Sequence, residues 1–117
     1  LADTCVSVYR TAAYFDTVRE RLGDDRVRGF ARMFATPSVG HNLDGPGGDP
    51  RSIDLLGALD AWVERGGAAP QDLVTTRFAA DGTTPVLQRP VCEYPRFPRY
   101  NGTGDPSRAD SFTCSAT

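Results

Sequence analysis

Proline and glycine occur so often in this chain that few long helices or strands can form. Nine prolines and twelve glycines are distributed over 117 residues. Proline lacks a backbone N–H and has a fixed φ, and glycine loses much conformational entropy when it is ordered, so both favour turns over element interiors. A chain of this length forms one domain and buries roughly two thirds of its unfolded surface. We therefore expect one loop-rich unit over residues 1–117 with a modest core.

Charge and hydropathy argue against two classes of partner. The net charge at pH 7 is −2, which does not suit a nucleic-acid surface. No apolar run approaches the roughly 20 residues that a membrane-spanning helix needs. The chain begins at Leu1 and shows no signal-peptide pattern. We therefore expect it to be an excised part of a longer protein, with no nucleic-acid or membrane partner.

Two segments have helical periodicity. Apolar positions recur at helical spacing after Ser7, and Gly23 is a typical C-terminal cap, which predicts a helix over residues 8–22. Asp54 precedes a second apolar stripe, and Gly66-Gly67 ends it. We expect this stripe to pack in the core; it consists of Leu55, Leu56, Leu59, Trp62 and Val63.

Strands and loops are expected in the rest of the chain. Loosely alternating apolar residues favour a strand near 28–34, and a β-branched stretch favours another over 70–78. Asp81-Gly82 is a hairpin-turn signal. Residues 36–50 form a long glycine-rich loop, and loops of this length are often functional. Residues 89–117 show no clear period, which predicts an irregular tail over the body.

The order of these parts suggests a catalytic pair. Asp3 lies in a turn before the first helix, and His41 lies in the long loop after the expected strand. Parallel strands joined by a helical crossover end at the same sheet edge, so Asp3 and His41 are expected to meet. In a serine triad the carboxylate orients the imidazole, which removes the proton of the serine. The competing interpretation is that His41 is an ordinary exposed loop histidine.

The nucleophile of such a triad is not in this sequence. The chain has no GxSxG elbow. Ser38 is close to His41 but lacks a strand–turn–helix context, and Ser52 is better explained as a helix cap. We expect the nucleophile and the oxyanion hole upstream of Leu1, and we expect the isolated chain to be inactive. One histidine and no CxxC pair argue against a metal site, and no cofactor is implied.

Motifs along nearly the whole chain occur in an order that is known from one family. They are Leu1-Ala2-Asp3, Tyr14-Phe15, Phe34, Pro37, Gly40-His41, Gly45-Pro46-Gly47-Gly48, Asp54-Leu55, Trp62-Val63-Glu64-Arg65-Gly66, Arg89-Pro90-Val91-Cys92, Tyr94-Pro95, Gly104-Asp105 and Ser111-Phe112-Thr113-Cys114. In this order they resemble the tannase and feruloyl esterase family. The Pro-Gly-His loop and the RPxC ending are the more specific parts of the resemblance.

The resemblance implies the fold and the chemistry. The family consists of α/β-hydrolases that cleave esters of aromatic acids. This chain would be the C-terminal portion of the sheet, with two parallel strands, two helices and an irregular tail stapled by a disulfide. Asp3 would be the triad acid and His41 the base, and Cys92 and Cys114 would match the C-terminal disulfide. The partners would be a small aromatic ester and the N-terminal part of the same protein, in a secreted or periplasmic setting.

One residue departs from the family pattern. The family usually has a cysteine after the histidine, bonded to a cysteine before the nucleophilic serine, whereas this chain has Asn42. Either a subgroup lacks that bridge, or Cys5 pairs with sequence outside the chain. The alternative function is a non-catalytic extracellular module whose loop and arginine–tyrosine tail form a binding surface. A hydrogen-bond distance between Asp3 and His41 would favour the esterase.

Overall fold

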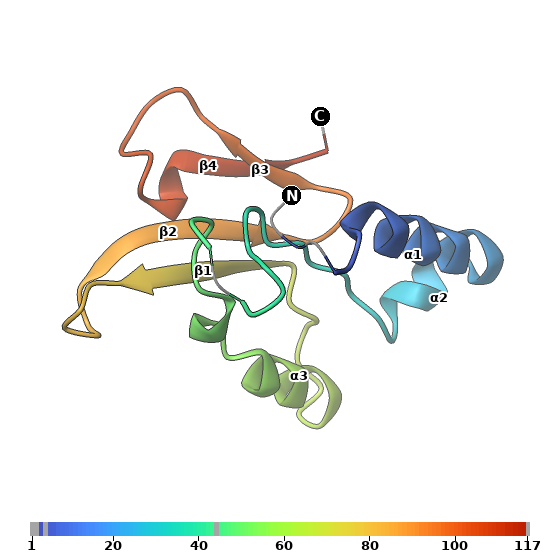
Figure 1. Ribbon diagram of the computed structural model, residues 1–117. Coiled ribbons are helices and arrows are strands. Elements are labelled where there is room, and N and C mark those ends of the chain that lie inside the picture. The colour runs from blue at the N-terminus through green and yellow to red at the C-terminus, as the bar shows by residue number, and fades with distance from the viewer. Residues whose placement is uncertain (1–2, 4, 44, 117) are drawn as a thin grey trace.

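The computed structural model describes residue 3, residues 5–43 and residues 45–116 (Figure 1). The elements described run in the order α1 (Val8–Leu22), α2 (Asp24–Arg28), η1 (Pro50–Ser52), α3 (Leu55–Val63), β1 (Asp72–Phe78), β2 (Pro85–Cys92), β3 (Phe97–Tyr100), η2 (Ala109–Ser111) and β4 (Phe112–Ser115). Within these ranges, none of the helices combines the length and the apolar composition that crossing a bilayer requires.

Helix α1 has the bounds that the periodicity predicts. Ser7 occupies the N-cap position, although its side chain makes no cap hydrogen bond. Gly23 ends the helix with a φ of 85°, and its N–H donates to the Arg19 carbonyl. A positive φ costs glycine little because it has no Cβ. The chain therefore turns sharply and enters α2 without an intervening loop.

The strand predicted near residues 28–34 is wrong. Helix α2 ends at Arg28, where the strand was expected to begin. Its first turn contains Asp24 and Asp25, whose negative charges stabilise a helix N-terminus. Only an isolated antiparallel bridge follows, between Phe34 and Glu93. The expected pair of parallel strands is also not found, since every strand pairing among the described residues is antiparallel.

Two antiparallel hairpin-like sheets form the second half of the described chain. β1 pairs with β2 from Asp72 opposite Cys92 to Phe78 opposite Pro85, which confirms the predicted strand and turn. The Asp81 carboxylate accepts hydrogen bonds from the backbone N–H groups of Thr83 and Thr84 in that turn. β3 pairs with β4 over four residues each. The tail predicted to be irregular is therefore substantially β-structure.

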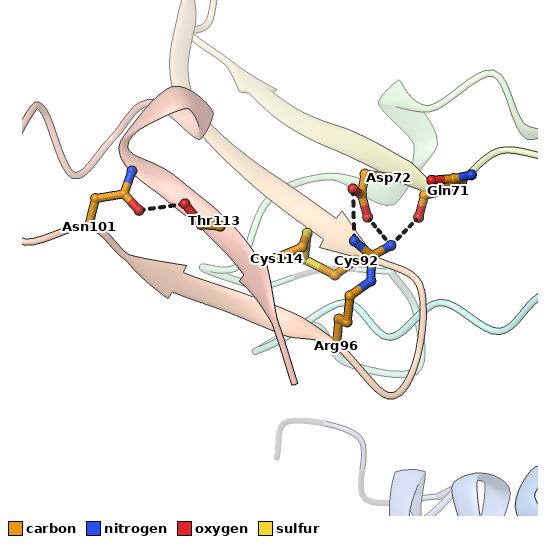
Figure 2. The surroundings of a disulfide bond; sticks show 7 residues. All are labelled: Gln71, Asp72, Cys92, Arg96, Asn101, Thr113 and Cys114. Carbon is orange, nitrogen blue, oxygen red and sulfur yellow. Dashed lines mark hydrogen bonds and ion pairs between the residues drawn. A yellow bond between two sulfur atoms is a disulfide. The ribbon is translucent and has the colours of Figure 1, made fainter. Parts of the chain in front are cut away.

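A disulfide joins the two sheets. Cys92 at the end of β2 bonds to Cys114 in β4, with a Cα–Cα distance of 5.6 Å (Figure 2). Beside it, the Arg96 guanidinium bonds to both carboxylate oxygens of Asp72 at the start of β1. The pairing implied for Cys92 and Cys114 is thus confirmed, and it holds β4 against the β1–β2 hairpin.

The core of the described chain is small. The buried apolar residues are Val27, Val91 and Cys92. The stripe of α3 was expected to be buried, but Leu56 is 77% and Val63 is 63% exposed. The accessible surface is 7736 Å², against about 6200 Å² for a compact folded chain of this mass. The apolar face of α3 therefore lacks a covering layer within the described residues.

Candidate active site

Asp3 is held by the turn that leads into α1. Its Oδ1 accepts hydrogen bonds from the backbone N–H of Cys5 at 2.7 Å and of Val6 at 3.1 Å. Aspartate favours such turns because its short side chain reaches the backbone two or three residues ahead. These two bonds hold the pKa of the Asp3 carboxyl below its usual value, and the contact with His41 adds to this effect. Asp3 is thus a fixed carboxylate at neutral pH.

His41 lies in the glycine-rich loop that was predicted from the sequence. The Leu43 N–H donates to the Gly40 carbonyl at 3.0 Å, so His41 lies within a tight turn. The Gly47 N–H donates to the Ser38 carbonyl at 3.3 Å and closes the loop. A Cβ on Gly47 would lie 1.7 Å from the carbonyl oxygen of Pro37. The loop can therefore fold back beside His41 only if residue 47 has no side chain.

The loop and the turn bring Asp3 and His41 together. The Nδ1 atom of His41 lies 3.3 Å from Oδ2 of Asp3, across a sequence separation of 38 residues. The Asp3 side chain is 28% exposed and the His41 side chain is 58% exposed. With Nδ1 facing the carboxylate, Nε2 is the nitrogen that is left to exchange a proton with another group. An Asp3–His41 contact within hydrogen-bond distance was the observation expected to decide between an esterase and a binding module, and it favours the esterase.

The path that joins the two residues differs from the expected one. They meet through α1, α2 and the extended segment after α2, rather than through two parallel strands. Phe15 of α1 contacts the Tyr94 ring edge-on at 6.4 Å, and the Tyr94 hydroxyl donates to Asp16 at 2.8 Å. The Tyr94 N–H donates to the Met33 carbonyl at 2.8 Å. Tyr94 therefore fixes α1 and the His41-bearing segment to the same point.

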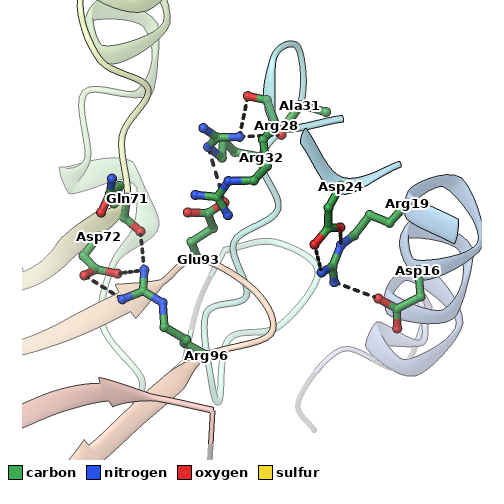
Figure 3. Close-up of polar contacts among 10 residues, drawn as sticks. All are labelled: Asp16, Arg19, Asp24, Arg28, Ala31, Arg32, Gln71, Asp72, Glu93 and Arg96. Carbon is green, nitrogen blue, oxygen red and sulfur yellow. Dashed lines mark hydrogen bonds and ion pairs between the residues drawn. The ribbon is translucent and has the colours of Figure 1, made fainter. Parts of the chain in front are cut away.

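A buried ion cluster supports the segment that carries His41. Glu93 is 8% exposed, and its Oε1 lies 3.2 Å from Arg28 Nη1 and 3.3 Å from Arg32 Nε (Figure 3). The Arg32 guanidinium also lies 5.4 Å from the centre of the Trp62 ring of α3. Arg32 also donates a hydrogen bond to the Arg28 carbonyl at the end of α2, and it therefore connects α2, the end of β2 and α3. Sequence reasoning missed this cluster, because nothing in the local pattern pairs these charges.

A largely apolar groove opens beside Asp3. Its volume is about 590 Å³, and it lies between the start of α1, residues 33–39 and residues 94–98. The groove is lined by Asp3 and by apolar residues that include Val6, Tyr9, Met33, Val39, Phe97 and Pro98. A volume of this size is within the range of small-molecule sites.

The sequence pointed to Cys5 only as a possible disulfide partner, and not as a neighbour of Asp3 and His41. Cys5 is exposed and forms no disulfide with the other cysteines of the chain. One atom each of Asp3, Cys5 and His41 can be chosen so that all three lie within 4.8 Å of one another. The signal that could have found it was its position two residues after Asp3.

Comparison with known proteins places the chain in a family. Residues 1–115 match the family described as tannase and feruloyl esterase. The chain belongs to this family. It is 38% identical over 98% of its length to a probable feruloyl esterase of Arthroderma benhamiae, and 37% identical over 99% to a mono(2-hydroxyethyl) terephthalate hydrolase of Piscinibacter sakaiensis. The family expected from the sequence is therefore confirmed.

The matched relatives are much longer than this chain. It covers 21% of the Arthroderma protein and 19% of the Piscinibacter protein. The crystal structure of an esterase from Aspergillus oryzae superposes with a TM-score of 0.82 at 24% identity, over 97% of this chain and 25% of that one. The fold described above thus matches that of a segment of the Aspergillus esterase.

Proposed function

We propose that this chain is the C-terminal part of a serine esterase with an α/β-hydrolase fold, and that it supplies Asp3 and His41 of the catalytic triad. The contact between His41 Nδ1 and Asp3 Oδ2 at 3.3 Å carries this proposal. Membership of an esterase family supplies the reaction class. The contact is at the long end for a hydrogen bond, and such bonds commonly tighten when substrate binds.

In the proposed mechanism His41 transfers one proton in each half of the catalytic cycle. Asp3 accepts the Nδ1–H bond, so Nε2 is free to take the proton of the serine hydroxyl as its oxygen attacks the acyl carbon. The imidazolium then donates that proton to the departing alcohol, which leaves an acyl-enzyme. In the second half of the cycle, His41 takes a proton from the water that attacks the acyl-enzyme and gives it to the serine oxygen as the acid leaves. The lowered pKa of Asp3 keeps the carboxylate charged throughout this cycle.

The nucleophile is proposed to come from a part of the protein outside this chain. Two observations support this. The sequence has no GxSxG elbow, and the relatives are about five times as long as the region that matches. The exposed apolar side of α3, with Leu56 and Val63, would be covered by the remainder of the protein. Exposed apolar surface of this kind marks a contact with another layer.

The substrate is proposed to be an ester of an aromatic acid. The names of two relatives at 37–38% identity specify a feruloyl ester and a terephthalate ester, both of which have aromatic acyl groups. The apolar groove of about 590 Å³ beside Asp3 is large enough for an aromatic ring.

The protein is proposed to be secreted or periplasmic. The disulfide between Cys92 and Cys114 supports this setting, since cytosolic disulfides are rare.

Kinetics of variants in the intact protein test the assignment. Replacing His41 by Gln, or Asp3 by Asn, should lower kcat for an aryl ester by about 10⁴-fold, as loss of a triad member does elsewhere. Asp25→Asn is the matched control, because it removes an exposed carboxylate of α2 that the mechanism does not use. Its rate should stay within about threefold. A His41→Gln variant with normal kcat would overturn the proposal, and so would serine-dependent turnover by the isolated 117 residues.

A further inference from the structure

We infer that Asp3, Cys5 and His41 form a binding site for a soft divalent cation such as Zn²⁺, and that its occupation switches the catalytic pair off. The cation site stands on geometry alone, and only its effect on turnover rests on the proposed function. The sequence argued against a metal site because it has one histidine and no CxxC pair, but the fold brings a carboxylate and a thiol beside that histidine. Carboxylate, thiolate and imidazole together make a donor set that Zn²⁺ prefers.

The three donor atoms already converge. One ligand atom from each residue can be chosen so that all lie within 4.8 Å of one another. A tetrahedral zinc ion with bond lengths of 2.0–2.3 Å sets its ligands about 3.3–3.8 Å apart. Small rotations of the exposed Cys5 and His41 side chains would close this difference. Three protein ligands leave the fourth position to water, which is the composition of an open zinc site.

The backbone prepares the site from one side. The hydrogen bonds from Cys5 and Val6 engage Oδ1 of Asp3 and leave Oδ2 directed at His41. The same turn brings Cys5, two residues along the chain, close enough that its Sγ lies within 4.8 Å of a carboxylate oxygen of Asp3. Free cysteines are usually buried, whereas Cys5 is exposed. The Cys5 thiol is thus accessible to a cation, and the Asp3 carboxylate and the His41 imidazole lie beside it as further ligands.

Metal binding would compete directly with proton transfer. On binding, the Cys5 thiol releases its proton to solvent, the Nδ1 proton of His41 moves to Nε2, and Nδ1 and Asp3 Oδ2 bond to the cation. His41 can then neither accept the proton of a serine nor keep its contact with Asp3. Because the ligands must be deprotonated, affinity falls as the pH is lowered. Zn²⁺ would therefore act as a reversible inhibitor that a chelator removes.

Cobalt substitution in the intact protein tests the site without relying on turnover. Addition of Co²⁺ should produce a thiolate-to-cobalt charge-transfer band in the near ultraviolet, and Zn²⁺ should displace it. The band should be lost in Cys5→Ser, because the other two cysteines of this chain are bonded to each other. Asp25→Asn, which removes an exposed carboxylate of α2, is the matched control and should keep the band. A missing band in the wild type, or one that persists in Cys5→Ser, would overturn the inference.

Zinc titrations with an aryl ester give the second readout. Each variant is compared with its own metal-free rate. Zn²⁺ should inhibit the wild type and EDTA should restore it, and Cys5→Ser should need more than about tenfold higher Zn²⁺ for the same inhibition. Equal sensitivity of both proteins would contradict the inference. If His41→Gln abolishes turnover while no cobalt band forms, the proposed function stands and the metal site falls. If the band forms while His41→Gln is fully active, the reverse holds.

Discussion

Replacing Glu93 by Gln should destabilise the segment that carries His41. Glu93 is 8% exposed and lies 3.3 Å from Arg32, which is 12% exposed. Removing one partner of a buried ion pair typically costs about 3–5 kcal/mol, because the other charge is left without compensation. The Gln amide oxygen can still accept a hydrogen bond, which offsets about 1 kcal/mol. We therefore expect a loss of about 2–4 kcal/mol in the free energy of unfolding.

Trp62 offers a local readout for this change. It is the only tryptophan of the chain, and the Arg32 guanidinium lies over its ring. Urea unfolding followed by tryptophan fluorescence therefore reports on the junction of Arg32, Glu93 and α3. In a longer protein, further tryptophans would be replaced by Phe before the comparison. A lower midpoint with an unchanged slope would show a loss of stability rather than a change of the unfolded state.

A double-mutant cycle separates the two arginines. Glu93 also lies 3.2 Å from Arg28, but the Arg28 side chain is 49% exposed. An exposed pair contributes about 1 kcal/mol or less, so coupling between Glu93→Gln and Arg28→Leu should be small. Coupling between Glu93→Gln and Arg32→Leu should reach about 2 kcal/mol. Equal coupling energies, or a Glu93→Gln variant within about 0.5 kcal/mol of wild type, would refute the reasoning.

Three further changes probe the scaffold around the site. Replacing Cys92 and Cys114 together by Ala should lower the free energy of unfolding by about 3 kcal/mol, because the disulfide closes a loop of 22 residues. A loss below about 1 kcal/mol in a denaturant titration would contradict this. Hydrogen bonds from Thr84 and Thr83 lower the pKa of Asp81 from 3.8 to about 2, so its stabilisation is present above pH 4 and lost as the pH falls toward 2. In Asp81→Asn, the free energy of unfolding should therefore depend less on pH between 4 and 2. An unchanged pH dependence would contradict the stabilising role of the Asp81 carboxylate in this turn. Gly47→Ala should displace the His41 loop, because its Cβ would meet Pro37, and an unchanged crystal structure would contradict this.

Local patterns predicted the two longer helices well. The period of α1 ends at Gly23, and the α3 stripe begins after Asp54, whose carboxylate accepts from the Gly57 N–H. These capping residues and apolar positions lie within or next to the helices that they specify, so local sequence is sufficient to predict them. Burial of the α3 stripe could not be predicted in the same way. It depends on which layer covers Leu56 and its neighbours, and no periodicity carries that information.

Long-range pairing explains the errors elsewhere. The segment after Arg28 was expected to be a strand, but strands need a partner, and only Phe34 finds one, opposite Glu93. β3 and β4 were overlooked because Pro98 and the glycine-rich turn between them mask the alternation. Their register depends on contacts such as the Cys92–Cys114 bond. The meeting of Asp3 with His41 was predicted, although the route between them was not.

The tautomer of His41 tests the central claim most directly. His41 is the only histidine of the chain, so its imidazole nitrogens can be assigned by selective ¹⁵N labelling and comparison with His41→Gln. If Asp3 orients the ring, neutral His41 should carry its proton on Nδ1, and Asp3→Asn should shift the population toward the Nε2–H form. An identical tautomer population in the wild type and in Asp3→Asn would contradict the account.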